Sequence, residues 1–247
     1  VYDLQFAEPA EDEIPPSVME NTAFAAPYEA VTEMYSRPKI GSLDPSFMMA
    51  PWHFIFFGMM LSDAGYGLLL TILLFIVLKV LKPEDNAGKL VTVIFLGSIS
   101  TIFWGAMFGG WFGLEFKPIL LSPMNEPLKM LALCFGLGAA HIILGVCMKM
   151  YLEIKRGQIW NAIFDQLSWL VIFAGLGLMA FMPDTQVGKY LALSGMTVII
   201  LTGGREKKNI FRRLLSGVLS LYNISGYFSD LLSYSRLFAL GLSTGVI

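Results

Sequence analysis

Long apolar stretches separated by short polar connections dominate the chain. They cover residues 48–81, 89–112, 128–151, 160–182, 189–203 and 214–247. A bilayer crossing needs roughly 20 apolar residues, and lipid offers no partner to a backbone that does not bond within itself. The pattern therefore predicts an all-α, multi-pass transmembrane helical bundle.

The first apolar stretch, 48–81, is too long for a simple crossing and holds Ser-Asp-Ala-Gly-Tyr-Gly at 62–67. One interpretation is a single helix, which places residues 1–47 outside the cell. The other is a short hairpin that turns at Asp63–Gly67, which places them in the cytoplasm, because glycines and aspartate favour turns. Charge alone leaves both open.

Lys and Arg gather in alternate connections. The connections at 79–89, 149–156 and 205–213 are rich in them, whereas 113–129 and 183–189 hold few. The positive-inside rule assigns the basic set to the cytoplasm. Residues 1–47 form a polar, acidic, proline-containing lead-in with one short helix expected near 27–36.

Small residues recur every four positions in the 89–112 stretch. The series is Gly97, Thr101, Gly105, Gly109 and Gly113. Small residues at this spacing line one helix face and let a neighbouring helix approach closely. We expect tight helix packing there rather than a ligand site.

Composition agrees with a membrane chain and excludes other classes. Of the 247 residues, 55% are hydrophobic and 15% charged, and the net charge is −2. Soluble domains carry about 25% charged residues, and no basic surface points to nucleic acid. Because the chain starts at Val1 and stops inside an apolar run, we expect a piece of a longer protein.

The sharpest functional candidate is Arg236, roughly 20 residues into the last apolar stretch. A charged residue at such a depth indicates function, and arginine stays a fixed cation in proteins. Helical spacing places three serines on its stripe, namely Ser229, Ser233 and Ser243. This stripe suits a water-accessible path beside a partner carboxylate. The alternative is an internal ion pair, although the nearest acid, Asp230, lies to one side.

Two further acids are weaker candidates. Asp63 fits a polar relay, but turn or cap chemistry is favoured, and Glu115 is a candidate for lining an aqueous vestibule. Asp165 and Gln166, which open the 160–182 stretch, are interpreted as a solvated helix end. Phosphate-loop, dinucleotide-binding and His-Glu-x-x-His motifs are all absent from the sequence, so we expect no catalytic site, cofactor or metal.

Two unusual stretches resemble subunit I, the membrane stator subunit a, of V/A-type ATPases. They are PWHFIFFGMMLSDAGYG at 51–67 and GYFSDLLSYSRLFALGL at 226–242. The resemblance covers the chain from about residue 20 onward and is closer to the bacterial and archaeal branch. It implies a cytosolic N-terminal domain followed by eight membrane helices, so this chain would carry helices one to seven.

The resemblance favours the hairpin. It implies a cytoplasmic lead-in at 1–47 and a transmembrane domain at 48–247, with a long, tilted last helix. The predicted helices cover about 48–63, 66–81, 89–112, 128–156, 160–182, 189–203 and 211–247.

By the same resemblance, the chain is a non-catalytic subunit that translocates H⁺ or Na⁺. Arg236 would face the proteolipid c-ring, displace the ion from the ring carboxylate and block leakage. Further residues expected on the ion path are Ser229, Ser233, Ser243, Asp230 and Tyr234. The other expected partners are the lipid bilayer and, through the N-terminal domain, the peripheral stalk and other subunits. The expected location is the cell membrane of a bacterium or archaeon.

Departures from the family pattern limit this transfer. Eukaryotic relatives have a histidine eight residues after the arginine and a glutamate fourteen residues before it, where this chain has Thr244 and Tyr222. The runner-up interpretation is a secondary transporter in which Arg236 anchors a substrate anion, and the third is a purely structural membrane scaffold.

Overall fold

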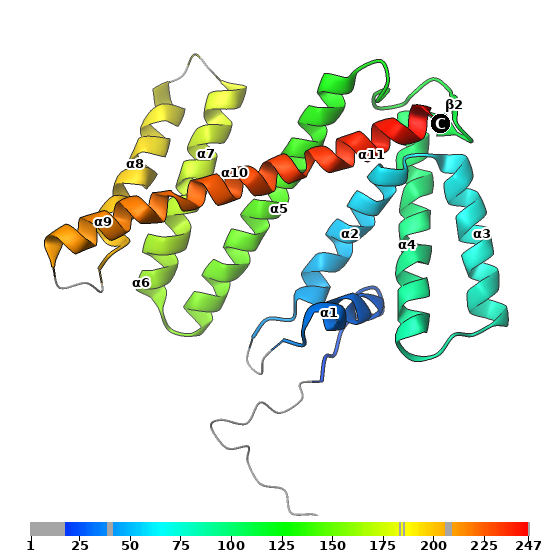
Figure 1. Cartoon of the computed structure of the whole chain (residues 1–247), viewed down its shortest axis with the longest axis horizontal. Helices are drawn as coiled ribbons and strands as arrows, with labels where there is room; N and C mark the ends of the chain where they lie inside the picture. Colours follow the sequence, from blue (N-terminus) through cyan, green and yellow to red (C-terminus); the bar gives the residue numbers. More distant parts are fainter. Residues whose placement is uncertain (1–17, 39–41, 183, 185, 206–208, 247) are drawn as a thin grey trace, which may run out of the picture. The chain divides into compact units, whose positions relative to one another are not determined.

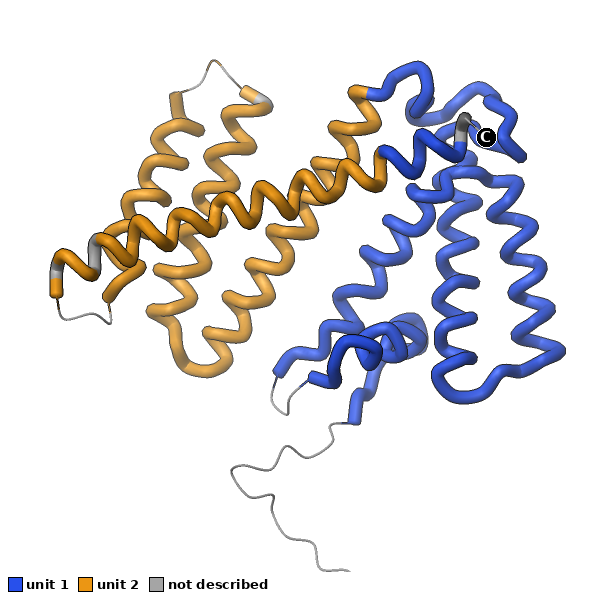
Figure 2. The backbone as a smooth tube through the Cα atoms, viewed as in Figure 1, with its two compact units in different colours: residues 1–127, 239–247 blue, residues 128–238 orange. Residues whose placement is uncertain are grey.

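The computed structural model describes residues 18–38, 42–182, 184, 186–205 and 209–246, and helices form most of them (Figure 1). The rest of the predicted 1–47 lead-in, and Ile247, lie outside the described residues. Contacts divide the chain into two compact units (Figure 2). Unit 1 comprises residues 1–127 and 239–247, and unit 2 comprises residues 128–238.

The lead-in begins with a short helix, as predicted near 27–36. The 3-10 turn η1 (Ala26–Tyr28) continues into α1 (Glu29–Tyr35). Tyr28 is fully buried in a small apolar cluster with Ala50 and Val93, and burial raises its pKa to about 12. The lead-in is further held by Lys89, which pairs with Glu29 at 2.6 Å.

The 48–81 stretch forms two helices, α2 (Pro45–Leu61) and α3 (Ala64–Val80). Figure 1 shows α3 turning back from the end of α2, which agrees with the hairpin and not with a single helix. The interruption lies at Ser62, whose φ of 39° is left-handed, and at Asp63, which caps α3. The predicted turn at Asp63–Gly67 is therefore placed too late, because Gly65 and Gly67 lie inside α3.

Helix α4 (Asp85–Phe108) packs against both α2 and α3. A Cβ atom at Gly97 would lie 2.5 Å from the Phe57 ring, and one at Gly105 would lie 2.5 Å from the Asp63 carbonyl carbon. The predicted tight packing is therefore confirmed for these two residues. The predicted stripe was wrong at its end, because Gly109, with a φ of +80°, terminates α4, and Gly113 lies in the following loop.

A short antiparallel ladder follows α4, formed by β1 (Gly110–Trp111) and β2 (Leu114–Glu115). Helix α4 was expected to continue to residue 112, but Gly110–Trp111 form a strand instead. Along α3, apolar side chains face outward over its whole length, which suits a surface covered by lipid rather than water. They are Leu68, Leu69, Ile72, Leu73, Phe75 and Ile76.

Unit 2 begins at the second residue of the 29-residue helix α5 (Pro127–Lys155). The next stretch contains α6 (Ile159–Asn161), the π-helical turn η2 (Ala162–Leu167) and α7 (Ser168–Phe181). Helix α8 (Gln186–Thr202) packs closely on α7. A Cβ atom at Gly175 would lie 2.6 Å from the Ala192 amide nitrogen, so a glycine is needed for this approach.

The last apolar stretch forms three helices rather than the single helix predicted for 211–247. They are α9 (Ile210–Leu221), α10 (Asn223–Ser233) and α11 (Ser235–Val246). Tyr222 and Tyr234 separate them, and each keeps helical dihedral angles. Tyr234 donates its N–H to the Leu231 carbonyl at 3.1 Å and accepts from Leu237 at 3.0 Å, so tighter three-residue hydrogen bonds replace the usual four-residue ones.

Three helices within the described residues are long and apolar enough to cross a membrane. They cover Asp85–Phe108, Pro127–Lys155 and Ile159–Ala180. Shorter apolar helices cover Pro45–Leu61, Ala64–Val80 and Gln186–Thr202. The fold is thus all-α with three long candidate spans, and the count of seven crossings stays a prediction.

Candidate functional site

Arg236 is the second residue of α11, and its side chain is exposed. The ion pairs of the described residues include Arg37–Glu33, Lys89–Glu29 and Arg205–Asp165. Arg236 takes part in none of them, and neither does Asp230, which is also exposed. The alternative in which Arg236 pairs with an acid of its own bundle therefore finds no support among the described side chains.

The three serines predicted to share the stripe of Arg236 are exposed as well. Ser233 donates its hydroxyl to the Ser229 carbonyl at 2.9 Å, and Ser243 donates to the Leu240 carbonyl at 3.0 Å. Since each of these two hydroxyl protons is used within the helix, the oxygen lone pairs remain available to other groups. The exposed side of α10–α11 thus presents one cation together with hydroxyl oxygens, and we call Ser229, Ser233, Arg236 and Ser243 the open stripe.

The other side of α10 packs within unit 2. Tyr227 lies against Trp169 and Phe173, with ring centroids 4.9 Å and 5.2 Å away. Tyr234 was predicted to lie on the ion path with Arg236, but its hydroxyl lies 2.7 Å from His141 Nδ1 on α5. The structure therefore places Tyr234 on the packed side and not in the open stripe.

Asp63 is a buried cap, with an exposed fraction of 4%. Its Oδ1 accepts the N–H groups of Tyr66 at 2.9 Å and Phe112 at 3.0 Å, and its Oδ2 accepts that of Gly113 at 2.8 Å. One carboxylate thus caps α3 and holds the loop after α4. This geometry agrees with the favoured cap interpretation, and the contact to residues 112–113 was not predictable from sequence.

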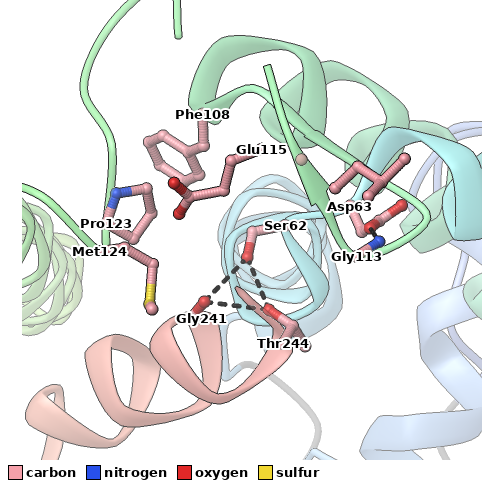
Figure 3. Close-up of a pocket in the computed structure, with 11 residues that line it drawn as sticks. Ser62, Asp63, Phe108, Gly113, Glu115, Pro123, Met124, Gly241 and Thr244 are labelled. Carbon is pink, nitrogen blue, oxygen red and sulfur yellow. Dashed lines mark hydrogen bonds between the residues drawn. The ribbon is translucent and has the colours of Figure 1, made fainter. Parts of the chain in front are cut away.

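Beside Asp63 lies a hollow of about 30 Å³, contained in unit 1 (Figure 3). Ser62 hydrogen bonds the hydroxyl of Thr244 at 3.0 Å and the Gly241 carbonyl at 3.3 Å. Glu115 lines the same hollow, and its role in an aqueous vestibule stays a prediction. A space of this size holds one or two water molecules.

A larger polar hollow of about 340 Å³ lies in unit 2, lined by residues of α5, η2, α8 and α10. Arg205 donates to Asp165 at 2.8 Å and to Asn161 beside it. Gln166 also lines the hollow and is only 4% exposed. Its interpretation as a solvated helix end was wrong, because the π-helical turn directs it inward. Such turns often mark functional positions, but the sequence pattern carried no signal for this one.

In the described part of the chain, side chains are not grouped as metal ligands are. Among these residues, no group of three or more His, Cys, Asp or Glu side chains is arranged to hold a metal ion. The open stripe offers a fixed cation and hydroxyl oxygens, which can act on a charged partner electrostatically.

Comparison with known proteins gives relatives along nearly the whole chain, although no protein-family model matches it. The chain is 30% identical to the A-type ATP synthase subunit I of Methanocaldococcus jannaschii, over 98% of the chain. It is 32% identical to that of Pyrococcus horikoshii over 99% of the chain. The V-type ATP synthase subunit I of Borreliella burgdorferi is 29% identical over 98% of the chain.

The chain spans less than half of these relatives. It covers 40% of the Methanocaldococcus protein, 38% of the Pyrococcus protein and 44% of the Borreliella protein. The expected resemblance is nevertheless confirmed, because several relatives align from one end of this chain to the other. Over nearly all of its length, the chain belongs to the family of A- and V-type ATP synthase subunits I.

Proposed function

We propose that this chain is the ion-translocating part of the membrane stator in a rotary V/A-type ATPase, without a catalytic site of its own. In this proposal the open stripe faces a proteolipid ring. The relatives are named as subunits of ATP synthases, and ion translocation against such a ring is the function that best uses an exposed arginine in an apolar segment.

The exposure of Arg236 without an ion pair among the described side chains is the observation that carries the proposal. A guanidinium left against lipid is costly, so this side chain calls for an anionic partner outside the chain. A ring carboxylate must be neutral to face lipid, by binding H⁺ or Na⁺. Beside Arg236 its ionised form becomes favoured, the cation is released, and the fixed positive charge opposes direct leakage.

Each unit holds a hollow large enough for water. The hollow at Ser62 and Glu115 lies by the 113–129 connection, which is poor in Lys and Arg. The hollow at Lys149 and Asp165 lies by two basic connections. By the positive-inside rule the first opens to the outer side and the second to the cytoplasm. We assign them to the two half-channels.

The remaining parts of the proposal follow from the family. The chain crosses the cell membrane seven times through residues 48–247, with residues 1–47 in the cytoplasm. Its partners are the ring, the bilayer and, through an N-terminal domain, the peripheral stalk and other subunits.

The test is Arg236→Gln in the full-length subunit of the assembled complex, reconstituted into vesicles. Arg156→Gln, which removes an exposed arginine at the end of α5, is the matched control. We expect both complexes to assemble, with ATP-driven ion uptake lost only in Arg236→Gln. Uptake near the wild-type rate in Arg236→Gln would overturn the proposal. Anion-dependent uptake by the subunit alone would support the transporter alternative instead.

A further inference from the structure

Tyr234 is anchored to α5 by two features that lie one helical turn apart. Its hydroxyl lies 2.7 Å from His141 Nδ1, within hydrogen-bonding distance. Its ring lies over Gly138, where an added Cβ atom would come within 2.6 Å of the ring carbons. Residues three apart on a helix share a face, so α5 offers both a space for the ring and a polar partner for the hydroxyl.

This anchor lies two residues before Arg236 in the chain. Two residues correspond to about 200° around an α-helix, so a side chain that points into the bundle at Tyr234 sends the one at Arg236 outward. Tyr234 is also where α10 ends and α11 begins. Its two three-residue hydrogen bonds make this an irregular point of the helix, as at Tyr222, and hence a point where an external constraint affects the direction of α11.

We propose that the hydrogen bond between His141 and Tyr234 is the positioning contact that sets the rotation of α11 and thereby aims Arg236 away from its own bundle. The inference rests on the proposed function and adds two positioning residues to it. Neither residue is required to meet the translocated ion.

The ring contacts of Tyr227 on α10 lack this directional character. Tyr227 lies against the rings of both Trp169 and Phe173, and such ring contacts tolerate a range of tilts. A hydrogen bond constrains distance and angle together, and between membrane helices it faces little competition from water. The bond at Tyr234 therefore fixes rotation, whereas the contact at Tyr227 mainly holds α10 against α7.

The test uses Tyr234→Phe, His141→Phe and the double variant in the assembled complex, with Tyr151→Phe as the control. Tyr151 is a largely exposed tyrosine on α5. The measured quantity is the number of ions taken up per ATP hydrolysed. We expect each single variant to lower this ratio by about three- to tenfold, as loss of one hydrogen bond allows. The double variant should be no worse than either single variant, because both remove the same interaction.

Several outcomes would overturn the inference. Ratios within twofold of wild type in both single variants would contradict it, as would effects that multiply in the double variant. ATP hydrolysis and uptake that fall together would show an assembly defect instead of misdirected Arg236. If Arg236→Gln abolishes uptake in the same experiment, the proposed function stands even when this inference fails.

A milder variant covers the case in which the aromatic substitutions prevent assembly. His141→Gln keeps a side chain able to hydrogen bond the Tyr234 hydroxyl. We expect its ion-to-ATP ratio to stay within twofold of wild type. A loss as large as threefold in His141→Gln, in a complex that assembles normally, would contradict the proposed role.

Discussion

Helix α4 and the α10–α11 segment carry similar series of small and polar residues, but their surroundings differ. On α4, Ser98, Ser100 and Thr101 are fully buried, and Gly105 lies against the backbone at the start of α3. On α10–α11, Gly226 and the serines of the open stripe are exposed, and nothing lies within 4 Å of a Cβ atom added at Gly226. The same sequence signal therefore accompanies a filled interface in one region and an uncovered face in the other.

The spacing of small and polar residues alone therefore does not distinguish a helix face packed inside the chain from a face that docks a partner. The small residues of α4 pack against α2 and α3 of the same chain. The open stripe differs in holding a cation, and this cation has no ion-pair partner among the described side chains, which points to a partner elsewhere. The charge at Arg236, more than the small residues, marks the functional face.

The largest effect expected from this comparison comes from placing the same bulky residue on both helices. Gly105→Leu puts a side chain against backbone atoms that cannot move aside, so we expect the full-length subunit to lose about 3 kcal/mol of unfolding free energy. Gly226→Leu should change it by less than about 0.5 kcal/mol. Unfolding in detergent measures the stability of both variants. Equal losses of unfolding free energy at the two positions would contradict the distinction between a packed α4 and an uncovered α10.

A second comparison concerns two carboxylates with opposite surroundings. Asp63→Ala leaves three backbone N–H groups without their acceptor, which should cost about 2 kcal/mol of stability. Asp63→Asn should cost less, because one oxygen remains. Asp230→Ala, at an exposed position, should change stability by less than about 0.5 kcal/mol. Thermal unfolding of the purified subunit distinguishes them, and an unchanged midpoint in Asp63→Ala would contradict the cap.

The smallest effect is expected at Asp44, a half-covered carboxylate that caps α2. Burial raises its pKa, but hydrogen bonds from the Ser46 N–H, the Asn21 amide and the Ser46 hydroxyl outweigh this and lower it below 3.8. The ionised Asp44 carboxylate therefore contributes fully to the free energy of unfolding above pH 3.8. This contribution is lost as the pH falls through the lower pKa of the folded state.

Asp44→Asn should remove this pH dependence while keeping an oxygen that caps α2, so its cost in stability should stay below about 1 kcal/mol. Unfolding measured between pH 2.5 and pH 6 tests the sign, provided that wild type and Asp44→Asn are compared at each pH. If acidification stabilised the wild type relative to Asp44→Asn, the lowered pKa of Asp44 would be contradicted.

Much of the fold was predictable because lipid restricts the choice of structure. Apolar length alone located the helices to within about four residues, and the break at Ser62–Asp63 agrees with one of two stated options. The divisions at Tyr222 and Tyr234 were not predictable, since both residues keep helical dihedral angles and neither is a helix breaker. At Tyr234 the division coincides with the contact to His141 on α5.

The candidate site was likewise predictable only in part. Arg236 was identifiable from sequence because a lone charge in an apolar stretch is costly wherever the helices lie. The inward position of Gln166 depends on the π-helical turn, and the role of Asp63 depends on a loop some fifty residues later. Such long-range contacts leave no periodic signal in the chain.

The measurement that tests the central claim most directly is photo-crosslinking in the assembled complex, with a benzophenone side chain placed at Ser229, at Ser233 or at Leu231. The account predicts that the two positions on the open stripe capture a proteolipid subunit, whereas the half-buried Leu231 captures only its own chain. Capture of the proteolipid from Leu231 but from neither serine would contradict the account, because Arg236 would then lie on the wrong side of the helix.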